Sequence, residues 1–193
     1  MMNEVKFFTD GACSGNPGRG SWGVVVTDYN LYKNEKSLPI AYHGGVTEDT
    51  TNNREELRAI LYAFHLINEY KREDDFHNIK REYIINSDSA YCVNALNNWI
   101  YKWVNNGWTT SKGDEVKNID LFEIIFHYII KFPDVQINKV SGHNGVIENE
   151  LADQLATRKV VESKYPTPGP HTFKFKKQEI QFVFDLNPPR FNS

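Results

Sequence analysis

The hydrophobic pattern at the start of the chain predicts three β-strands. Val5–Phe8 is short and apolar, Trp22–Val26 is apolar and β-branched, and Pro39–Val46 is a weaker third stretch with glycines near its end. Between the first two lies a glycine-rich segment, residues 10–20, which predicts a turn region. We therefore expect Asp10 to follow directly after the first strand.

The middle of the chain changes to the helical period, in which apolar residues recur every three or four positions. This pattern predicts a helix over residues 53–71, built on Leu57, Ile60, Leu61, Phe64 and Ile67. Asn52 or Asn53 is expected to cap it, with Glu56 placed as in a capping box. Similar signals predict a strand, two helices, a strand and a last helix over residues 82–86, 89–106, 118–131, 135–140 and 148–161.

This order of elements favours a mixed α/β sheet with helices on its faces. The segment from Pro166 to Pro170 predicts a stiff linker that ends the domain. Beyond it, residues 171–186 twice alternate apolar and polar side chains, which predicts a hairpin or two edge strands with a turn near Lys177–Glu179. The phenylalanines of this tail either pack back on the domain or form a docking peptide for another protein, such as a replication partner.

The composition is that of a folded globular protein. Of its 193 residues, 40% are hydrophobic and 24% are charged, which is enough apolar surface for a core. The two cysteines, Cys13 and Cys92, cannot form a disulfide framework and favour a reducing compartment. No secretory signal is apparent, and no apolar run approaches the roughly 18 residues of a membrane span. We expect a cytoplasmic protein.

The net charge of −3 argues against an ordinary nucleic-acid binder, because phosphate contacts favour a basic surface. Four of the 22 basic residues and two of the 25 acidic residues follow residue 164. The first 164 residues therefore carry 18 basic against 23 acidic side chains, a net charge of −5. With this balance, a polyanion can be bound only through a local basic patch or through bound cations.

Four carboxylates lie at notable points of this pattern. Asp10 and Asp88 follow predicted strands, and Asp153 lies in the last predicted helix. Glu56 borders the apolar face of its helix, whereas Glu55 is expected to point outward. Taken singly, each of the four has an ordinary structural explanation as a turn residue, a helix-dipole or capping residue, or a solvated helix position.

The sequences around these carboxylates form four motifs in a fixed order. They are Phe8-Thr9-Asp10-Gly11-Ala12-Cys13 with Asn16-Pro17-Gly18, Thr51-Asn52-Asn53-Arg54-Glu55-Glu56-Leu57, Asn86-Ser87-Asp88-Ser89-Ala90-Tyr91, and Val140-Ser141-Gly142-His143 with Glu148-Asn149-Glu150 and Asp153. Their order and spacing over residues 3–160 resemble those of type 1 ribonucleases H. A lone Asp-Gly or Ser-Asp-Ser would carry no such information.

The resemblance implies a fold and a division of the chain. The expected fold is α/β and ribonuclease H-like, with a five-stranded mixed sheet flanked by helices. Residues 1–164 would form the catalytic domain, and residues 165–193 a C-terminal extension. The resemblance also implies that His143, on a loop, assists proton transfer and product release, a role that suits a pKa near neutrality.

The resemblance further implies that Asp10, Glu56, Asp88 and Asp153 converge at one sheet edge and bind two Mg²⁺, for which Mn²⁺ can substitute. Mg²⁺ prefers carboxylate, phosphate and water oxygens. In a two-metal site, one ion activates the attacking water and the other stabilises the leaving 3′-oxygen. The RNA strand of an RNA–DNA hybrid would thus be cut to leave 5′-phosphate and 3′-hydroxyl ends. Without metal the carboxylates repel one another, so at least one pKa should be raised.

Recognition of a hybrid requires contacts to both strands, and the 2′-hydroxyl distinguishes the RNA. Glu56 would also read a ribose 2′-hydroxyl. By resemblance, the residues in contact with nucleic acid are Cys13, Asn16, Asn52 and Ser89 on the RNA strand, and Thr51 and Asn118 at a DNA phosphate. Turn or capping chemistry, typical of Asn and Ser, is the alternative for each of them.

Trp99, Trp103 and Trp108, with Lys102, resemble a helical protrusion that grips the DNA strand in some family members. Aromatic rings beside cations can stack on sugars or bases. Packing inside the protrusion is the alternative, and we expect it for two of the three tryptophans. Here Val104-Asn105-Asn106 replaces the basic cluster of bacterial members. We therefore expect weaker hybrid binding with a shallow salt dependence.

Three other classes of function stay open at this point. They are a hybrid-binding module without catalysis, another polynucleotidyl transferase such as an integrase or a Holliday-junction nuclease, and a fragment of a reverse transcriptase. All four carboxylates are kept, and the TTNNREEL and GHNG sequences favour the hybrid endonuclease. We expect a monomer whose partner is the hybrid, with a protein partner for the tail as the remaining option.

Overall fold

The fold is described from a computed structural model. The structure describes residues 4–30, 35–36, 40–142, 145–157, 169–175 and 178–184, with side chains over residues 4–28, 46–142 and 145–157. The strands are β1 (Glu4–Ser14), β2 (Gly18–Asn30), β3 (Glu35–Lys36), β4 (Ile40–Thr50), β5 (Glu82–Ser87), β6 (Gln136–Lys139), β7 (Gly169–Phe175) and β8 (Gln178–Phe184). The helices are α1 (Asn52–His77), α2 (Ala90–Asn94), the π-helical turn η1 (Ala95–Trp99), α3 (Ile100–Asn105), α4 (Ile119–Lys131) and α5 (Ile147–Ala156).

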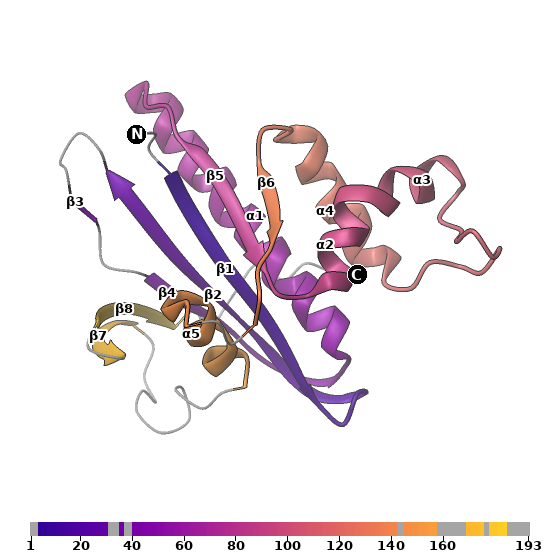
Figure 1. The fold of residues 1–193 in the computed structure, drawn as a ribbon, viewed down its shortest axis with the longest axis horizontal. Helices are drawn as coiled ribbons and strands as arrows, with labels where there is room; N and C mark the ends of the chain where they lie inside the picture. Colours follow the sequence, from indigo (N-terminus) through magenta and orange to yellow (C-terminus); the bar gives the residue numbers. More distant parts are fainter. Residues whose placement is uncertain are drawn as a thin grey trace.

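A five-stranded mixed sheet in the order β6-β5-β1-β2-β4 forms the centre of the fold (Figure 1). β1 is antiparallel to β2 and parallel to β5, β2 is antiparallel to β4, and β5 is parallel to β6. Helices α1 and α5 pack on this sheet. The predicted α/β architecture, with helices flanking five mixed strands, is confirmed.

The first two strands are much longer than the hydrophobic pattern predicts. β1 continues past Phe8 to Ser14, and β2 begins at Gly18, so only residues 15–17 form the turn. The prediction that Asp10 follows the strand is therefore wrong, since Asp10 pairs with Gly23 inside the hairpin. Pairing with β2 holds this polar and glycine-rich stretch in the extended conformation, which its side chains alone do not indicate.

The core lies between the sheet and α1, with α2, η1, α3 and α4 closing one side. Gly11 permits the close approach of α1, because a Cβ at this position would lie 2.1 Å from the backbone nitrogen of Glu56. α1 begins one residue earlier than expected and is capped by Thr51, whose side chain accepts from the Arg54 amide at 3.4 Å. The prediction of an Asn52 or Asn53 cap is wrong.

Helix α1 also runs past the predicted end at Lys71. Its last turns stay attached to the sheet through Asp74, which is buried, accepts a hydrogen bond from the Tyr83 hydroxyl and forms an ion pair with Arg81. The helix ends at His77, where Asn78 adopts the left-handed conformation with φ 54°. A buried carboxylate paired with groups of β5 is a tertiary feature that helical periodicity does not reveal.

The helical stretch predicted over residues 89–106 is confirmed, but it contains a π-helical turn between α2 and α3. α4 and β6 also match the predicted ranges to within a residue. The last helix begins one residue earlier than predicted and ends at Ala156, where Thr157 caps it, so the predicted end at residue 161 is wrong. None of the helices in the described residues has the length and apolar character that a membrane crossing requires.

The tail forms the expected hairpin. β7 and β8 pair antiparallel with Phe173 opposite Ile180, and β8 adds parallel to the outer edge of β4. The two strands include residues that were predicted for the linker and for the turn. Gly169 and Pro170 belong to β7 and not to the linker, and Gln178 and Glu179 belong to β8 and not to the turn. The division of the chain at residue 164 stays a prediction.

Candidate active site

The end of strand β5 creates an open edge at the centre of the sheet. The last backbone pair between β1 and β5 joins Thr9 to Ser87. Beyond it β1 continues and β5 stops, so Asp10 and Asp88 emerge next to each other. Asp10 is buried and accepts a hydrogen bond from the Gly11 amide at 2.8 Å, while Asp88 is half-buried.

The third carboxylate reaches this edge from α1. Glu56 lies in the first turn of the helix, where the missing side chain of Gly11 lets the helix backbone rest on β1. One oxygen from each of Asp10, Glu56 and Asp88 forms a group in which all atoms lie within 4.8 Å of one another. Glu56 is only 5% exposed, and its buried Oε2 has no hydrogen-bond partner among the residues that the structure describes. Three acidic oxygens thus converge in a poorly solvated place.

The three carboxylates of the group are poorly solvated and close enough to repel one another. Burial, followed by the charges of Asp88 and Asp153, raises the pKa of Asp10 from 3.8 to about 7. Burial, followed by the charges of Asp10 and Asp88, raises the pKa of Glu56 well above its usual value. The predicted rise of at least one pKa is confirmed. A divalent cation would remove this repulsion.

Asp153 approaches from the opposite face of the sheet. Gly23, the partner of Asp10 in β2, faces α5, since a Cβ there would lie 2.5 Å from Leu155 Cβ and 2.8 Å from the Ala152 oxygen. Asp153 follows Ala152 and is close enough for its charge to raise the pKa of Asp10. It is not part of the 4.8 Å group, which has three members within the described residues.

The loop predicted to carry the histidine passes over Asp88. The Val140 amide donates to the Ser87 oxygen at 3.0 Å, and a Cβ at Gly142 would lie 3.0 Å from Asp88 Oδ2. His143 itself lies outside the described residues. The loop therefore leaves the sheet beside the carboxylate group, directly before the position of the predicted histidine.

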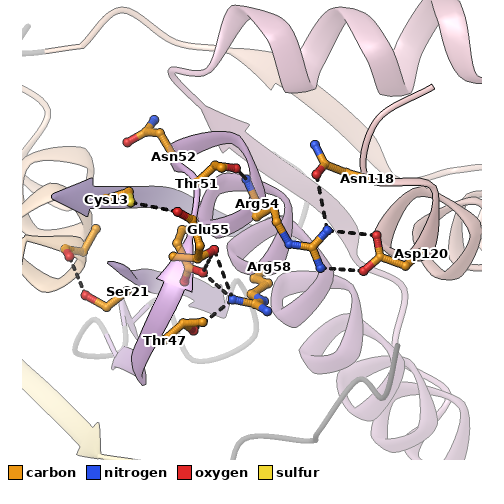
Figure 2. A network of polar contacts seen from close by, with 12 residues as sticks. Cys13, Ser21, Thr47, Thr51, Asn52, Arg54, Glu55, Arg58, Asn118 and Asp120 are labelled. Atoms are coloured by element: carbon orange, nitrogen blue, oxygen red, sulfur yellow. Dashed lines mark hydrogen bonds and ion pairs between the residues drawn. The ribbon is translucent and has the colours of Figure 1, made fainter. Parts of the chain in front are cut away.

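Three of the residues expected along the RNA strand lie near the start of α1. Asn16, in the β1–β2 turn, accepts from the Asn52 amide at 3.0 Å. The Cys13 thiol donates to the Thr50 oxygen at 3.2 Å, next to the Thr51 cap of α1 (Figure 2). Ser89 is the cap of α2, where its hydroxyl accepts from the Cys92 amide. The turn and capping roles considered as alternatives are thus present: Ser89 caps α2 directly after Asp88, and Asn16 and Cys13 join the β1–β2 hairpin to the start of α1.

Thr51 and Asn118, the two residues expected at a DNA phosphate, both bind Arg54. The Thr51 hydroxyl accepts from the Arg54 amide, and the Arg54 guanidinium donates to Asn118 Oδ1 at 3.3 Å and to Asp120 Oδ1 at 2.9 Å (Figure 2). Asn118 has a left-handed backbone with φ 63° at the start of α4. Two polar residues far apart in sequence are therefore both bound to Arg54, Thr51 through its backbone amide and Asn118 through its guanidinium.

The tryptophan-rich segment borders a surface hollow of about 390 Å³. Trp99 is 38% exposed beside Lys102, and the hydroxyls of residues 109–111 line the other side. Trp103 is half-buried, with its ring centroid 5.2 Å from that of Phe122. Trp108 also packs against the core. Trp103 and Trp108 pack on the core, as expected for two of the three tryptophans. Trp99, which is 38% exposed, also contacts the rings of Tyr91 and Trp103, with centroids 6.1 and 5.8 Å away.

The comparisons with known proteins agree with this geometry. A family model described as RNase H matches residues 2–161. The chain belongs to the ribonuclease H family. It is 38% identical over 164 residues to a ribonuclease H of Caldicellulosiruptor saccharolyticus, which corresponds to 84% of this chain and 100% of that protein. It is 40% identical over 172 residues to a ribonuclease H of Orientia tsutsugamushi, 89% of this chain and 91% of that one.

Among solved structures, LC9-RNase H1, "a type 1 RNase H with the type 2 active-site motif", is similar with a TM-score of 0.64 and 25% identity. The match covers 82% of this chain and 72% of that chain. The resemblance inferred from the four motifs is thus confirmed, and the chain is a ribonuclease H enzyme of type 1.

Several residues that shape the site of this ribonuclease H could not be recognised from local sequence patterns. Glu55 is wholly buried, with 0% exposure, so the prediction that it points outward is wrong. The reason is that the first turn of α1 is covered on both sides, by β1 and by the end of β4. The ion pair of Glu55 with Arg58 has the i, i+3 spacing, so it could have been predicted from the sequence. The Arg54–Asp120 pair spans 66 residues, and no local signal announces it.

Proposed function

We propose that this ribonuclease H hydrolyses the RNA strand of RNA–DNA hybrids with two divalent metal ions, leaving 5′-phosphate and 3′-hydroxyl ends. The observation that carries the proposal is the convergence of Asp10, Glu56 and Asp88 within 4.8 Å. Asp153 would complete the ligand set from α5, on the side from which its charge acts on Asp10.

The donor set fits Mg²⁺, with Mn²⁺ as a substitute. All candidate ligands are carboxylate oxygens, which hard divalent cations prefer, and the 4.8 Å group contains no thiol or imidazole. The buried, unpartnered Oε2 of Glu56 and the raised pKa of Asp10 both mark a place that lacks positive charge. When bound, such ions supply water activation and stabilisation of the leaving oxygen.

The protein's own part is to orient the hybrid across the open edge of the sheet. Ser89 directly follows Asp88, and Cys13, Asn16 and Asn52 lie near the start of α1, the helix that carries Glu56; these four are proposed to contact the RNA strand. Thr51 and Asn118, held by Arg54, are proposed to bind a phosphate of the DNA strand. The exposed ring of Trp99 with Lys102 offers a stacking surface farther along. His143 is proposed to assist proton transfer from the loop beside Asp88.

The cellular setting is proposed on the same basis. Cys13 and Cys92 are both free thiols, and burial raises the pKa of Cys92 to about 12, so it stays unreactive. Free thiols support a reducing compartment such as the cytoplasm. We propose that the enzyme acts there as a monomer.

An end-labelled substrate panel tests the function. Hybrid, duplex DNA, duplex RNA and single-stranded RNA are incubated with and without Mg²⁺, and the product ends are analysed. We expect cleavage of the RNA in the hybrid alone, dependent on Mg²⁺, with 5′-phosphate ends. Metal-independent cleavage would contradict the two-metal proposal, and hybrid binding without cleavage would favour the non-catalytic binding module.

A further inference from the structure

The first turn of α1 contains a buried charge that the proposed metal site does not use. Glu55 is 0% exposed, although its neighbour Glu56 supplies the carboxylate of the cluster. Glu55 Oε1 accepts from the Thr50 hydroxyl at 2.7 Å and from Arg58 Nη1 (Figure 2). Arg58 Nη1 also donates to Thr47 Oγ1 at 2.9 Å. Helix α1 is thereby tied to the last residues of β4.

Stability alone does not account for this arrangement. Glu55 is fully buried and the Arg58 side chain is 26% exposed. Desolvation of the pair costs free energy, and apolar replacements of a buried ion pair are often neutral or stabilising. The Cγ of Glu55 lies 3.0 Å from where a Gly20 Cβ would be, so the aliphatic part of this side chain packs against β2. An apolar residue at position 55 would suit the same surroundings. The pair instead fixes the orientation of the first turn of α1 relative to the end of β4, because each of its hydrogen bonds has a defined geometry.

The groups that the pair fixes belong to both sides of the site. On one side, Thr50 presents its backbone oxygen to the Cys13 thiol, where the RNA strand is proposed to lie. On the other, the Thr51 oxygen accepts from the Glu55 amide at 3.1 Å and starts the helix turn that carries Glu56. Glu55 thus stands at the junction of β4, the β1–β2 hairpin and α1.

We propose that Glu55, together with Arg58, is a positioning residue that sets the first turn of α1 so that the Glu56 carboxylate meets Asp10 and Asp88. The inference rests on the proposed function, since it concerns metal binding by the same cluster. Residues that orient metal ligands typically contribute about 10- to 100-fold to metal affinity. Disturbance of this pair should therefore weaken metal binding even when the fold is intact.

The test compares Glu55→Leu, the double variant Glu55→Leu/Arg58→Leu, and Glu55→Gln. Mn²⁺ binding is measured by calorimetry without substrate, and thermal unfolding is measured without metal. The single Leu variant should lose both stability and Mn²⁺ affinity, because Arg58 is left uncompensated. The double variant should recover the melting temperature and still bind Mn²⁺ about tenfold more weakly. Glu55→Gln, which keeps the acceptor oxygen, should retain most of the affinity.

A matched control is the exposed i, i+3 pair of Glu69 and Arg72 on the same helix, whose double Leu variant should leave Mn²⁺ affinity unchanged. A Glu55/Arg58 double variant that regains both stability and wild-type affinity would overturn the inference. If that variant does not fold, Thr50→Val decides: several-fold weaker Mn²⁺ binding supports the inference, and unchanged binding refutes it. A wild-type protein that binds no Mn²⁺ would instead refute the proposed function itself.

Discussion

Asp10 and Asp88 each follow one member of the last backbone pair between β1 and β5, Thr9 with Ser87. Parallel strands in register bring the next residues of both chains to the same level. Because β5 ends there while β1 continues, the two carboxylates share an edge that helices from both faces can reach. Glu56 arrives from α1, and Asp153 approaches from α5.

Removal of one carboxylate should abolish cleavage. We expect Asp10→Asn and Asp88→Asn each to lower kcat on an RNA–DNA hybrid by at least about 100-fold, since bound metal supplies several kcal/mol of transition-state stabilisation. Single-turnover cleavage measures the effect. Asp75→Asn, at an exposed position of α1, is the control and should retain full activity. Comparable activity of the Asp10 variant would exclude that carboxylate as a ligand.

Metal binding should depend on pH below neutrality. The pKa of Asp10 is about 7 in the metal-free fold and 3.8 as its ordinary value. The folded protein therefore keeps a proton that the unfolded chain releases, so this group's contribution to metal-free stability is full below about pH 4 and is lost as the pH rises to about 7. Metal must displace that proton, so affinity should rise by roughly tenfold per pH unit up to about 7 and then level off.

Calorimetry in two buffers of different ionisation enthalpy counts the protons released. At pH 6, Mn²⁺ binding to the wild type should release more protons than binding to Asp10→Asn. Metal affinity that is flat between pH 5 and 7 would contradict the raised pKa.

The Arg54–Asp120 pair should act on hybrid binding more than on chemistry. The Arg54 guanidinium lowers the pKa of Asp120, so the pair stays ionised at neutral pH and holds Asn118 in place. We expect Asp120→Ala to raise KM by about tenfold, which corresponds to about 1.4 kcal/mol, with little change in kcat. Asp134→Ala, which removes an ion pair with Lys71 elsewhere on α1, should change neither. A large loss of kcat with KM unchanged would contradict a role of the pair in hybrid binding.

Substitution of Trp99 should mainly affect hybrid binding, whereas substitution of Trp103 should mainly affect stability. Trp99→Ala should weaken hybrid binding by about tenfold, because the ring is 38% exposed and a stacked base contributes about 1–3 kcal/mol, and it should lose less stability than Trp103→Ala. Trp103→Ala should cost about 3 kcal/mol of unfolding free energy, since this ring packs on Phe122. Fluorescence anisotropy and urea unfolding measure the two effects. Affinity should fall only slowly with salt, and a steep decline would show a larger phosphate contact than we expect.

Deletion of residues 165–193 should destabilise the protein and leave cleavage intact. β8 pairs with β4 at Ile40–His43, and its loss exposes that edge. At about 0.2–1 kcal/mol for each cross-strand pair, we expect a loss of about 2 kcal/mol on urea unfolding. Unchanged stability would favour the alternative, a tail that docks on another protein.

Much of this molecule could be predicted from local patterns. The helical period located the first long helix because burial of one face requires apolar residues at that spacing, and the alternation in the tail predicted its hairpin for the corresponding reason in strands. The motifs around the four carboxylates identified the family. Strand lengths were less accessible, since residues 9–14 are polar or small and stay extended only because β2 pairs with them.

The amino-acid sequence therefore fixes the identity of the chemically active groups, because a carboxylate at a given position is set covalently. The environment of each group depends on the tertiary structure. Glu55 and Glu56 are adjacent acids in one helical turn, yet one pairs with Arg58 and the other joins Asp10 and Asp88. Only the packing of α1 on Gly11 and β4 separates them, since desolvation and Coulomb interactions depend on neighbours that are distant in the chain.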